Sequence, residues 1–263
     1  MLKNMISILM ISQKQKSKPT GDKMKIIADL HTHTNACTHA YSTIEEMVSA
    51  AAEKGLSAIA ITDHGRAMEG APGAYYFESI LAVPKDIMGV RVLKGMEANI
   101  IDFDGTLDAS DELLAKLEWV VASMHSITLF GEPSVEKCTQ AYLAMCDNPN
   151  VHVLGHSGQP YYAYDYETVV KRCVETSTLM EINNASFSGF RYESIPNCKT
   201  IAQLCKKHGA RIVVDTDAHF SAKVGEVSDA LKMLREIDFP PELVVNSSLE
   251  NLHEYFREKN IQI

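Results

Sequence analysis

Ten histidines are the feature of this 263-residue sequence that points most directly to chemistry. His31 and His33 stand one residue apart in ADLHTHT, and His39 follows in the same segment. Four more lie at the ends of short apolar runs: His64, His125, His156 and His219. Imidazole and carboxylate together form a ligand set for borderline divalent ions such as zinc, manganese or iron. The first hypothesis is therefore a metal site.

Two carboxylates occupy similar places, Glu97 in GMEANI and Asp217 in DTDAH. Four protein ligands satisfy one zinc ion, and a catalytic ion keeps a position for water. Seven histidines and two carboxylates are thus too many ligands for one ion and enough for two or three, of which we expect three. A lone histidine at a strand end is more often an ordinary side chain, so the expectation rests on the whole set.

The elements that carry these residues form a repeating α/β pattern. Short apolar runs alternate with amphipathic segments, an order that predicts a parallel sheet with helices outside it. The seven expected strands cover residues 25–31, 57–64, 89–100, 119–126, 151–158, 179–186 and 211–219. Units of about 34 residues predict a single-domain, closed or nearly closed seven-stranded (β/α)7 TIM-like barrel, with a doubly wound open sheet as the alternative. In such a barrel the carboxyl ends of all strands meet at one rim, which would gather the histidines and carboxylates.

Helices are expected between the strands because serine, threonine or aspartate precedes several amphipathic segments and glycine follows some of them. The expected helices cover residues 43–54, 75–88, 110–116, 134–147, 165–175, 196–208, 223–236 and 248–259. Asp102, Asp104 and Asp108 lack the spacing of a calcium-binding loop, so we expect a solvated acidic turn there.

The composition describes a globular chain, with 46% hydrophobic and 22% charged residues. A formal net charge of −9 repels polyanions, so no stable nucleic-acid partner is expected. Six cysteines without a C-x-x-C pair indicate reduced, mostly buried thiols in a cytoplasmic protein. Residues 1–23 contain an apolar run too short to span a membrane. We expect this segment to be an appended extension and the domain to cover residues 24–263.

The motifs ADLHTHT, AITDHG, GMEANI, SMHS, GHSGQP and DTDAH together resemble the PHP (polymerase and histidinol phosphatase) superfamily, over essentially all of residues 25–263. TDHGRAMEGAPGAYYF, EINNASF and GEVSDALKMLREIDFPPELVVN are most similar to its YcdX-type phosphatase branch. The resemblance implies a distorted seven-stranded barrel with a trinuclear site, usually zinc, that hydrolyses phosphate esters. One departure is Ser157, which follows His156 where the family usually has proline.

The resemblance also implies how the ligands divide among the ions. One ion would be held by His31, His33, Glu97 and Asp217, a second by Glu97, His125 and His156, and the third by His39, His64 and His219. Glu97 would bridge two ions, and Glu97 and Asp217 are the candidate catalytic carboxylates. The general acid stays open between a metal-bound water and Asp217. Asp63 either orients an imidazole or is a simple strand-end residue.

The expected function is hydrolysis of a small phosphate monoester by a metal-activated hydroxide at three divalent ions, most commonly zinc and otherwise manganese or iron. A dianionic ester needs a fixed cation besides the metals, and guanidinium binds phosphate oxygens in a bidentate way. Arg191 and Arg66 are the candidates, because they follow the sixth and second expected strands.

Three rival interpretations share parts of this pattern. A PHP-type phosphodiesterase or exonuclease acting on nucleotides would need a basic or aromatic approach to the site, which the net charge of −9 disfavours. An amidohydrolase-like barrel would place lysine at the fourth strand end, where this chain has His125. The third alternative is a non-catalytic metal-binding accessory barrel. The sequence does not indicate an oligomeric state.

Overall fold

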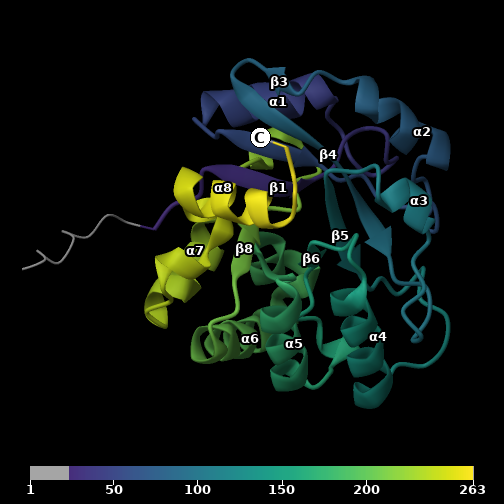
Figure 1. Ribbon diagram of the computed structural model, residues 1–263, viewed down its shortest axis with the longest axis vertical. Helices are drawn as coiled ribbons and strands as arrows, with labels where there is room; N and C mark the ends of the chain where they lie inside the picture. Colours follow the sequence, from purple (N-terminus) through teal and green to yellow (C-terminus); the bar gives the residue numbers. More distant parts are fainter. Residues whose placement is uncertain (1–23, 263) are drawn as a thin grey trace, which may run out of the picture.

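Parallel strands form a nearly closed barrel in the computed structural model of the protein, which describes residues 24–262 apart from the side chain of Phe190 (Figure 1). Neighbouring strands follow the order β1 (Ala28–Thr32), β2 (Ala58–Ile61), β4 (Val90–Asn99), β5 (Trp119–Ser123), β6 (Val153–Leu154), β7 (Leu179–Asn183) and β8 (Ile212–Asp215). The expected (β/α)7 TIM-like barrel is confirmed. A short strand that we did not expect, β3 (Asp86–Ile87), pairs antiparallel with β4. The expected extension, residues 1–23, lies outside the described residues.

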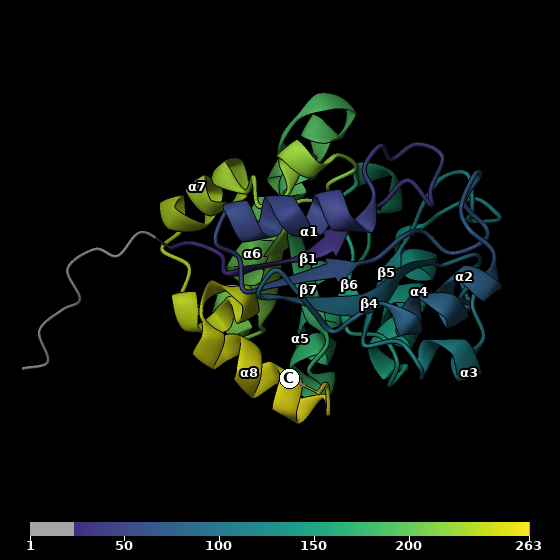
Figure 2. The ribbon, with the colours of Figure 1, turned by 90° about the horizontal axis from the view of Figure 1, so that it is seen from above.

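The α-helices lie outside the strands, as Figures 1 and 2 show. They are α1 (Ile44–Glu53), α2 (Ala74–Ser79), α3 (Asp111–Leu114), α4 (Val135–Asp147), α5 (Tyr166–Thr176), α6 (Ile195–His208), α7 (Ser228–Glu236) and α8 (Leu249–Glu258). Short 3-10 helices occupy the loops: η1 (Ile80–Ala82), η2 (Pro160–Tyr162), η3 (Asn184–Phe187), η4 (Gly189–Ser194), η5 (Ser221–Lys223), η6 (Pro241–Leu243) and η7 (Val245–Ser247). Thr43 and Glu46 form a reciprocal capping box at the start of α1, as its sequence predicts.

Two helices are shorter in the structure than the sequence predicts. The helix expected at 75–88 ends as α2 at Ser79, and a 3-10 turn leads into Pro84 and then β3. Proline lacks an amide hydrogen and disfavours helical geometry in the residue before it, which explains the early end. The helix expected at 223–236 begins at Ser228, because Gly225 adopts a left-handed φ of 72° that no α-helix accommodates.

The barrel closes between β8 and β1 through backbone hydrogen bonds at the mouth, where the amides of Asp217 and His33 donate to the carbonyls of His31 and Ala218. Further from the mouth it closes through the side chain of Asn246. Its Nδ2 donates to the carbonyl oxygens of Ala28 (2.8 Å) and Val214 (2.7 Å), and its Oδ1 accepts the amide of Val214 (3.1 Å). Nearer the mouth, the amide of Leu30 donates to Oδ1 of Asp215 over 2.7 Å. Side chains therefore satisfy backbone groups that a regular ladder would otherwise pair.

The barrel interior is apolar toward the amino ends of the strands and polar toward their carboxyl ends. Inward-facing residues such as Leu93, Trp119 and Val213 pack with Tyr255 and Phe256 of α8 in one buried cluster. The helix α8 thus covers the amino end of the barrel. A second, larger cluster fills the space between the outer faces of the strands and the helices α3 to α7.

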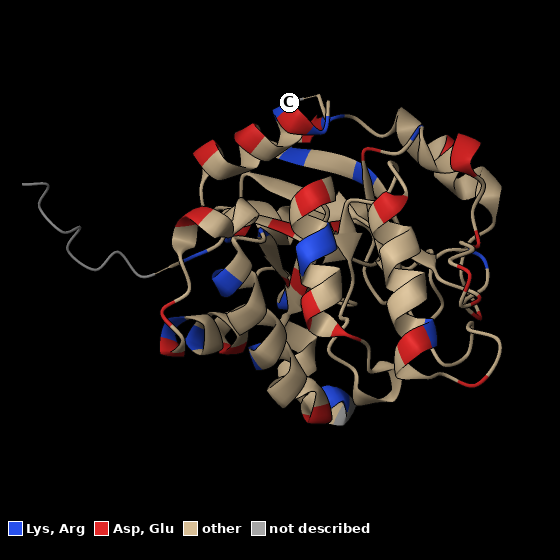
Figure 3. Cartoon of the chain, turned by 60° about the horizontal axis from the view of Figure 1, so that its bottom comes forward, with Lys and Arg blue, Asp and Glu red and all other residues tan. Residues whose placement is uncertain are grey.

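The distribution of surface charge and the state of the cysteines agree with what the composition predicts. Acidic and basic segments are interspersed on the outer helices in the view of Figure 3. All six cysteines are free and buried, as expected. No helix in residues 24–262 has both the length and the apolar character to cross a membrane.

Candidate metal centre

An irregularity in β1 turns two histidines into the barrel. Ala28 and Leu30 belong to the interior cluster, so strict alternation would place His31 and His33 on the outer side. The pairing of β1 with β2 shifts register between Asp29 and Thr32. A bulge exchanges the faces of the residues that follow it. As a result His31 and His33 both point to the centre of the mouth and are fully buried.

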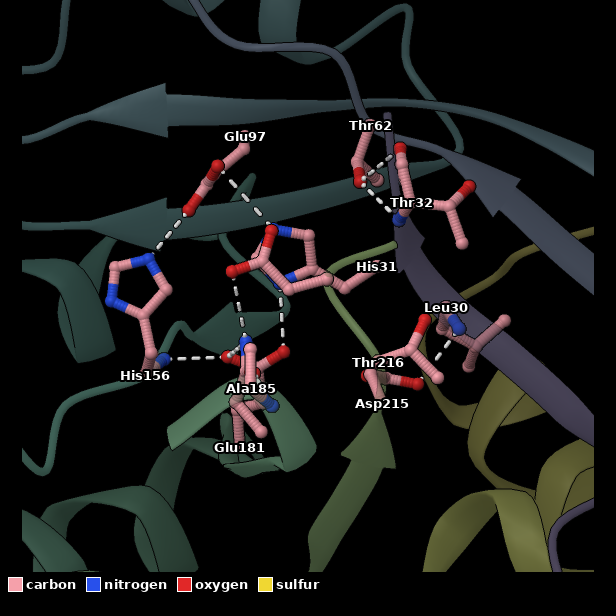
Figure 4. Close-up of polar contacts among 12 residues, drawn as sticks. Leu30, His31, Thr32, Thr62, Glu97, His156, Glu181, Ala185, Asp215 and Thr216 are labelled. Atoms are coloured by element: carbon pink, nitrogen blue, oxygen red, sulfur yellow. Dashed lines mark hydrogen bonds and ion pairs between the residues drawn. The ribbon is translucent and has the colours of Figure 1, made fainter. Parts of the chain in front are cut away.

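Glu97 of β4 lies at the centre of the site and is fully buried. Its Oε2 faces nitrogens of His31 (3.3 Å), His33 (3.4 Å) and His64 (2.7 Å). Its Oε1 faces nitrogens of His125 (3.4 Å) and His156 (2.9 Å). Figure 4 shows the carboxylate between His31 and His156. One side chain thus lies between two groups of imidazoles, in the position that a bridging ligand would take.

Asp217 follows β8 and completes the first group of candidate ligands. It adopts a left-handed φ of 58°, which is uncommon outside glycine and is found more often at functional sites. Its Oδ1 lies 3.1 Å from Nε2 of His33 and 3.7 Å from Nε2 of His31. The ligating atoms of His31, His33, Glu97 and Asp217 lie close enough together to hold one metal ion.

His39, His64 and His219 meet at the outer side of the mouth. The ring centroids of His39 and His64 are 5.0 Å apart, as are those of His39 and His219. Atoms of His33, His64 and His219 also lie within reach of one ion. The structure therefore brings all nine residues of the expected ligand set to the mouth: His31, His33, His39, His64, Glu97, His125, His156, Asp217 and His219.

The polar atoms of this cluster lack the partners that burial demands. Six of them are buried without a hydrogen bond of favourable geometry, and their short nitrogen–oxygen distances are to other members of the cluster. They are His31 Nε2, His33 Nδ1 and Nε2, His64 Nδ1, Glu97 Oε2 and Asp217 Oδ1. Burying such groups without partners costs several kcal/mol, roughly 2–7 for each neutral group. Lone pairs that converge on a shared space without partners are what a cation requires. The residues present therefore fit divalent metal ions.

Further polar groups fix the orientation of the histidine rings. Nδ1 of His31 lies 2.7 Å from Oε1 of Glu181, and Nδ1 of His125 lies 2.8 Å from Oδ1 of Asn99. Carboxylate or amide oxygens that hold one imidazole nitrogen direct the other nitrogen to the metal. Glu181 also accepts the backbone amide of His156 through Oε2, so one side chain of β7 ties β1 to the segment after β6 (Figure 4).

Glu181 was not among the predicted site residues, and the prediction for Asp108 was wrong. Glu181 could have been found, because positions 179, 181 and 183 of one strand share a face and residue 179 belongs to the interior cluster. Asp108 is not in a solvated turn: it is 3% exposed and accepts the amide hydrogens of Asn99 and Ala67. It thereby holds Asn99, which in turn holds His125. The turn that precedes it could not reveal this long-range contact.

Asp63 does not hold an imidazole by a hydrogen bond in the described residues. Its Oδ1 accepts the amide of Thr34 (2.7 Å), and its Oδ2 accepts the hydroxyls of Thr34 (2.8 Å) and Tyr76 (2.6 Å). Asp63 thus anchors the start of the loop that carries His39. Its role is to shape that loop.

The charges of the cluster favour a bound cation. Burial alone would raise the pKa of Glu97, but the imidazoles of His31, His64 and His125 hold it well below its usual range. Burial lowers the pKa of His125 to about 4. Burial also lowers the pKa of His31, but the carboxylates of Glu181, Glu97 and Asp217 outweigh it and raise this pKa well above 6.5. Negative charge therefore accumulates where a cation would bind.

A cavity of about 320 Å³ opens over the cluster. Arg191, in η4, lines it, and Nη1 of Arg191 donates to Oδ2 of Asp217 over 2.5 Å. Arg66 is exposed and lines a separate, smaller cavity of about 140 Å³ with Glu78 and Asp108. Of the two arginines considered for phosphate binding, the structure brings Arg191 to the site and leaves Arg66 beside it.

Comparison with known proteins gives close relatives. The sequence is 45% identical over 241 residues to a probable phosphatase of Acetivibrio thermocellus, covering 91% of this chain and 99% of the relative. It is 40% identical over 237 residues to a probable phosphatase of Clostridium acetobutylicum, covering 90% of this chain and 96% of the relative.

Two solved structures share the fold. A histidinol phosphate phosphatase from Lactococcus lactis, solved with zinc, L-histidinol and phosphate, superposes with a TM-score of 0.54 at 15% identity, covering 80% of this chain and 91% of that one. A chain in the cryo-EM structure of archaeal ribonuclease P with mature tRNA gives a TM-score of 0.56 at 13% identity, covering 88% and 91%. At these identities the likeness concerns the fold alone.

The family model for the PHP domain matches residues 29–261, which span β1 to the end of the last helix and include every residue of the cluster. The match reaches all seven parallel strands of the barrel. With the two relatives above, it establishes that this chain belongs to the PHP domain family.

Proposed function

We propose that the protein is a metal-dependent phosphatase that hydrolyses small phosphate monoesters. The observation that carries the proposal is the buried carboxylate of Glu97, which faces three imidazoles with one oxygen and two with the other. The names of the relatives, probable phosphatases, support the same reaction class.

Three divalent ions are part of the proposal, with zinc as the first choice and manganese or iron as alternatives. His31, His33, Glu97 and Asp217 would hold one ion, Glu97, His125 and His156 a second, and His39, His64 and His219 a third. Divalent ions bound at such sites make water a stronger nucleophile at neutral pH and neutralise charge on phosphoryl oxygens.

The protein's own groups have three tasks around those ions. Glu181 and Asn99 hold the rings of His31 and His125 in position. Burial of Glu97 under the mouth excludes water from its lone pairs. Arg191 lines the cavity and pairs with Asp217, which places a guanidinium beside the space where a phosphate group would bind.

The direct test is turnover of p-nitrophenyl phosphate by the purified protein after reconstitution with zinc or manganese, together with elemental analysis. We expect hydrolysis and about two to three metal equivalents per chain. One equivalent or fewer after reconstitution would contradict the trinuclear site. Metal binding without turnover would favour the accessory barrel, and turnover of bis(p-nitrophenyl) phosphate alone would favour the phosphodiesterase.

Replacement of Arg191 by alanine tests the phosphate contact. Arg191→Ala is expected to raise KM for a phosphomonoester about tenfold, equivalent to about 1.4 kcal/mol, with metal content unchanged. Arg66→Ala is the matched control, because Arg66 lines the neighbouring cavity, and it should change KM less than about twofold. Equal KM values in wild type and Arg191→Ala would leave the metal ions as the only phosphate contact.

A further inference from the structure

We infer that the site prefers phosphate esters of uncharged alcohols with an apolar ring or chain over esters of polyhydroxylated or cationic alcohols. This inference rests on the proposed phosphatase function and names the substrate class. Two features of the cavity carry it, the side chains left to contact the leaving alcohol and the charge of the cavity, and the exposed aromatic residues on the loops at that end of the barrel agree with it.

The cavity walls offer an apolar surface to the leaving alcohol. The described residues that line it are His39, His64, Met68, His125, Ala185, Arg191, Asp217 and His219. Five of these are proposed metal ligands and Arg191 is the phosphate contact, so Met68 and Ala185 remain. Neither side chain can form a strong hydrogen bond with a hydroxyl group. A sugar or glycerol moiety would therefore lose hydrogen bonds to water without replacement.

The charge of the cavity disfavours a cationic alcohol. Among the described residues that line the cavity, Asp217 is the only acidic one, and it faces His33 and is paired with Arg191. An ammonium group, such as that of the L-histidinol bound by the Lactococcus lactis protein, would meet Arg191 and the metal ions without a counter-charge of its own. An uncharged leaving alcohol avoids this repulsion.

Aromatic side chains are exposed on the loops at the carboxyl end of the barrel. Five strand-to-helix loops at the carboxyl end of the barrel each carry an aromatic residue that is at least half exposed: Tyr41 (72%), Phe130 (74%), Tyr161 (60%), Tyr192 (60%) and Phe220 (50%). Phe220 follows His219 directly and Tyr192 follows Arg191. The amide of Tyr41 donates to the carbonyl of His219 over 2.9 Å, so its loop rests against the site. Their rings add apolar surface at this end of the barrel, which an apolar ring or chain of the alcohol can contact.

A matched pair of esters tests the preference. 2-Phenylethyl phosphate and glycerol 1-phosphate are both primary alkyl monoesters, so their intrinsic reactivities are close and kcat/KM reports recognition of the alcohol. With the zinc-loaded protein we expect kcat/KM to be about tenfold or more higher for 2-phenylethyl phosphate. Equal values within about twofold, or a preference for glycerol 1-phosphate, would overturn the inference.

A substitution in the cavity wall tests whether Met68 contributes to this preference. Met68→Gln keeps the length of the side chain and adds a polar amide, so it should reduce the ratio of the two kcat/KM values by about threefold or more. Met88→Gln is the matched control, since Met88 is 64% exposed before β4, at the other end of the barrel. The same ratio in Met68→Gln and Met88→Gln would remove Met68 from the contact with the alcohol.

A binding measurement separates this inference from the proposed function. Calorimetric titration of the zinc-loaded protein with 2-phenylethylphosphonate and 2,3-dihydroxypropylphosphonate compares the two alcohol types without turnover. If neither these esters nor p-nitrophenyl phosphate is hydrolysed, the phosphatase proposal fails. The titration still decides the inference: about tenfold tighter binding of the phenyl compound supports it, and equal affinity overturns it.

Discussion

Both ends of the barrel contain buried histidines, but the ring nitrogens at the two ends differ in whether they have hydrogen-bond partners. At the mouth, both ring nitrogens of the fully buried His33 lack a hydrogen-bond partner. At the amino end, Nδ1 of His152 accepts the amide of Val120 over 3.1 Å, and its ring stacks on Trp119 with centroids 5.3 Å apart. The carbonyl of His152 accepts the hydroxyl of Tyr255 from α8.

This difference shows that hydrogen bonding, more than burial, separates the histidines of the proposed metal site from a histidine of the core. His152 is 7% exposed and burial lowers its pKa to about 3, so it is a neutral ring held by packing. His31, His33, His64 and His156 are as deeply buried, yet their nitrogens converge on one another and on Glu97. A structure that kept such groups without a ligand would be less stable than one with apolar side chains of the same size.

The largest effect is expected from Glu97→Gln. An amide keeps the shape of the side chain but removes the charge that faces five imidazoles, so we expect kcat/KM to fall about 10³-fold or more. Steady-state kinetics and elemental analysis on the same sample measure the loss. The circular dichroism spectrum should be unchanged, because the amino-end core is untouched. Near-wild-type turnover would show that Glu97 is not a central ligand.

The next largest effect is expected from Glu181→Gln. The amide places a donor opposite either His31 Nδ1 or the backbone amide of His156, where the carboxylate accepts from both. Loss of such an orienting group typically weakens metal affinity about 10- to 100-fold, measured by competition with a chelator. Glu193→Gln, an exposed exchange in η4, is the matched control. The same metal affinity in both variants would show that Glu181 does not support the site.

A smaller effect, dependent on pH, is expected at the amino end. The folded-state pKa of His152, about 3, lies below the ordinary value of 6.5, because burial disfavours the charged ring. Between these values the unfolded chain binds a proton that the folded protein does not, so stability is lost as pH falls from about 6.5 toward 3. The slope from this residue is at most about 1.4 kcal/mol per pH unit.

Urea unfolding of the metal-free protein at about pH 7 and pH 5 measures that slope, and His152→Gln should reduce it. The slope of the wild type is the reference for the slope of His152→Gln, because the candidate ligands at the mouth contribute equally to both. An unchanged slope would mean that His152 is accessible to protons in the folded state.

The smallest effects are expected from alanine at the histidines outside the mouth. His152→Ala, His208→Ala and His253→Ala should keep bound metal and kcat/KM, because these residues lie before β6, in α6 and in α8. His208 pairs with Glu167 over 2.8 Å on the surface, so its loss should cost less than about 1 kcal/mol of stability. Loss of metal in any of the three variants would contradict the separation of the two ends.

Much of the fold could be predicted because the strands and helices carry local sequence patterns. The strand that ends in Asp63 and His64 and the strand that contains Glu97 were both placed correctly, since each is a continuous apolar run before a polar rim residue. Thr43 and Glu46 marked the start of α1 for a local reason as well, a capping box. The end of α2 was missed because Pro84 and the β3–β4 hairpin compete with a helical pattern.

The sequence by itself determined the identity and order of the mouth residues, because the period of a strand and the direction of parallel strands are properties of the chain. Only the tertiary structure decided which groups hold those residues. Glu181 and His31 are 150 positions apart in the sequence. Asn246, which joins β1 to β8, is 218 positions from Ala28, whose carbonyl oxygen it contacts. Hydrogen bonds between such distant residues depend on barrel closure and on a bulge in β1, and neither leaves a local pattern in the sequence.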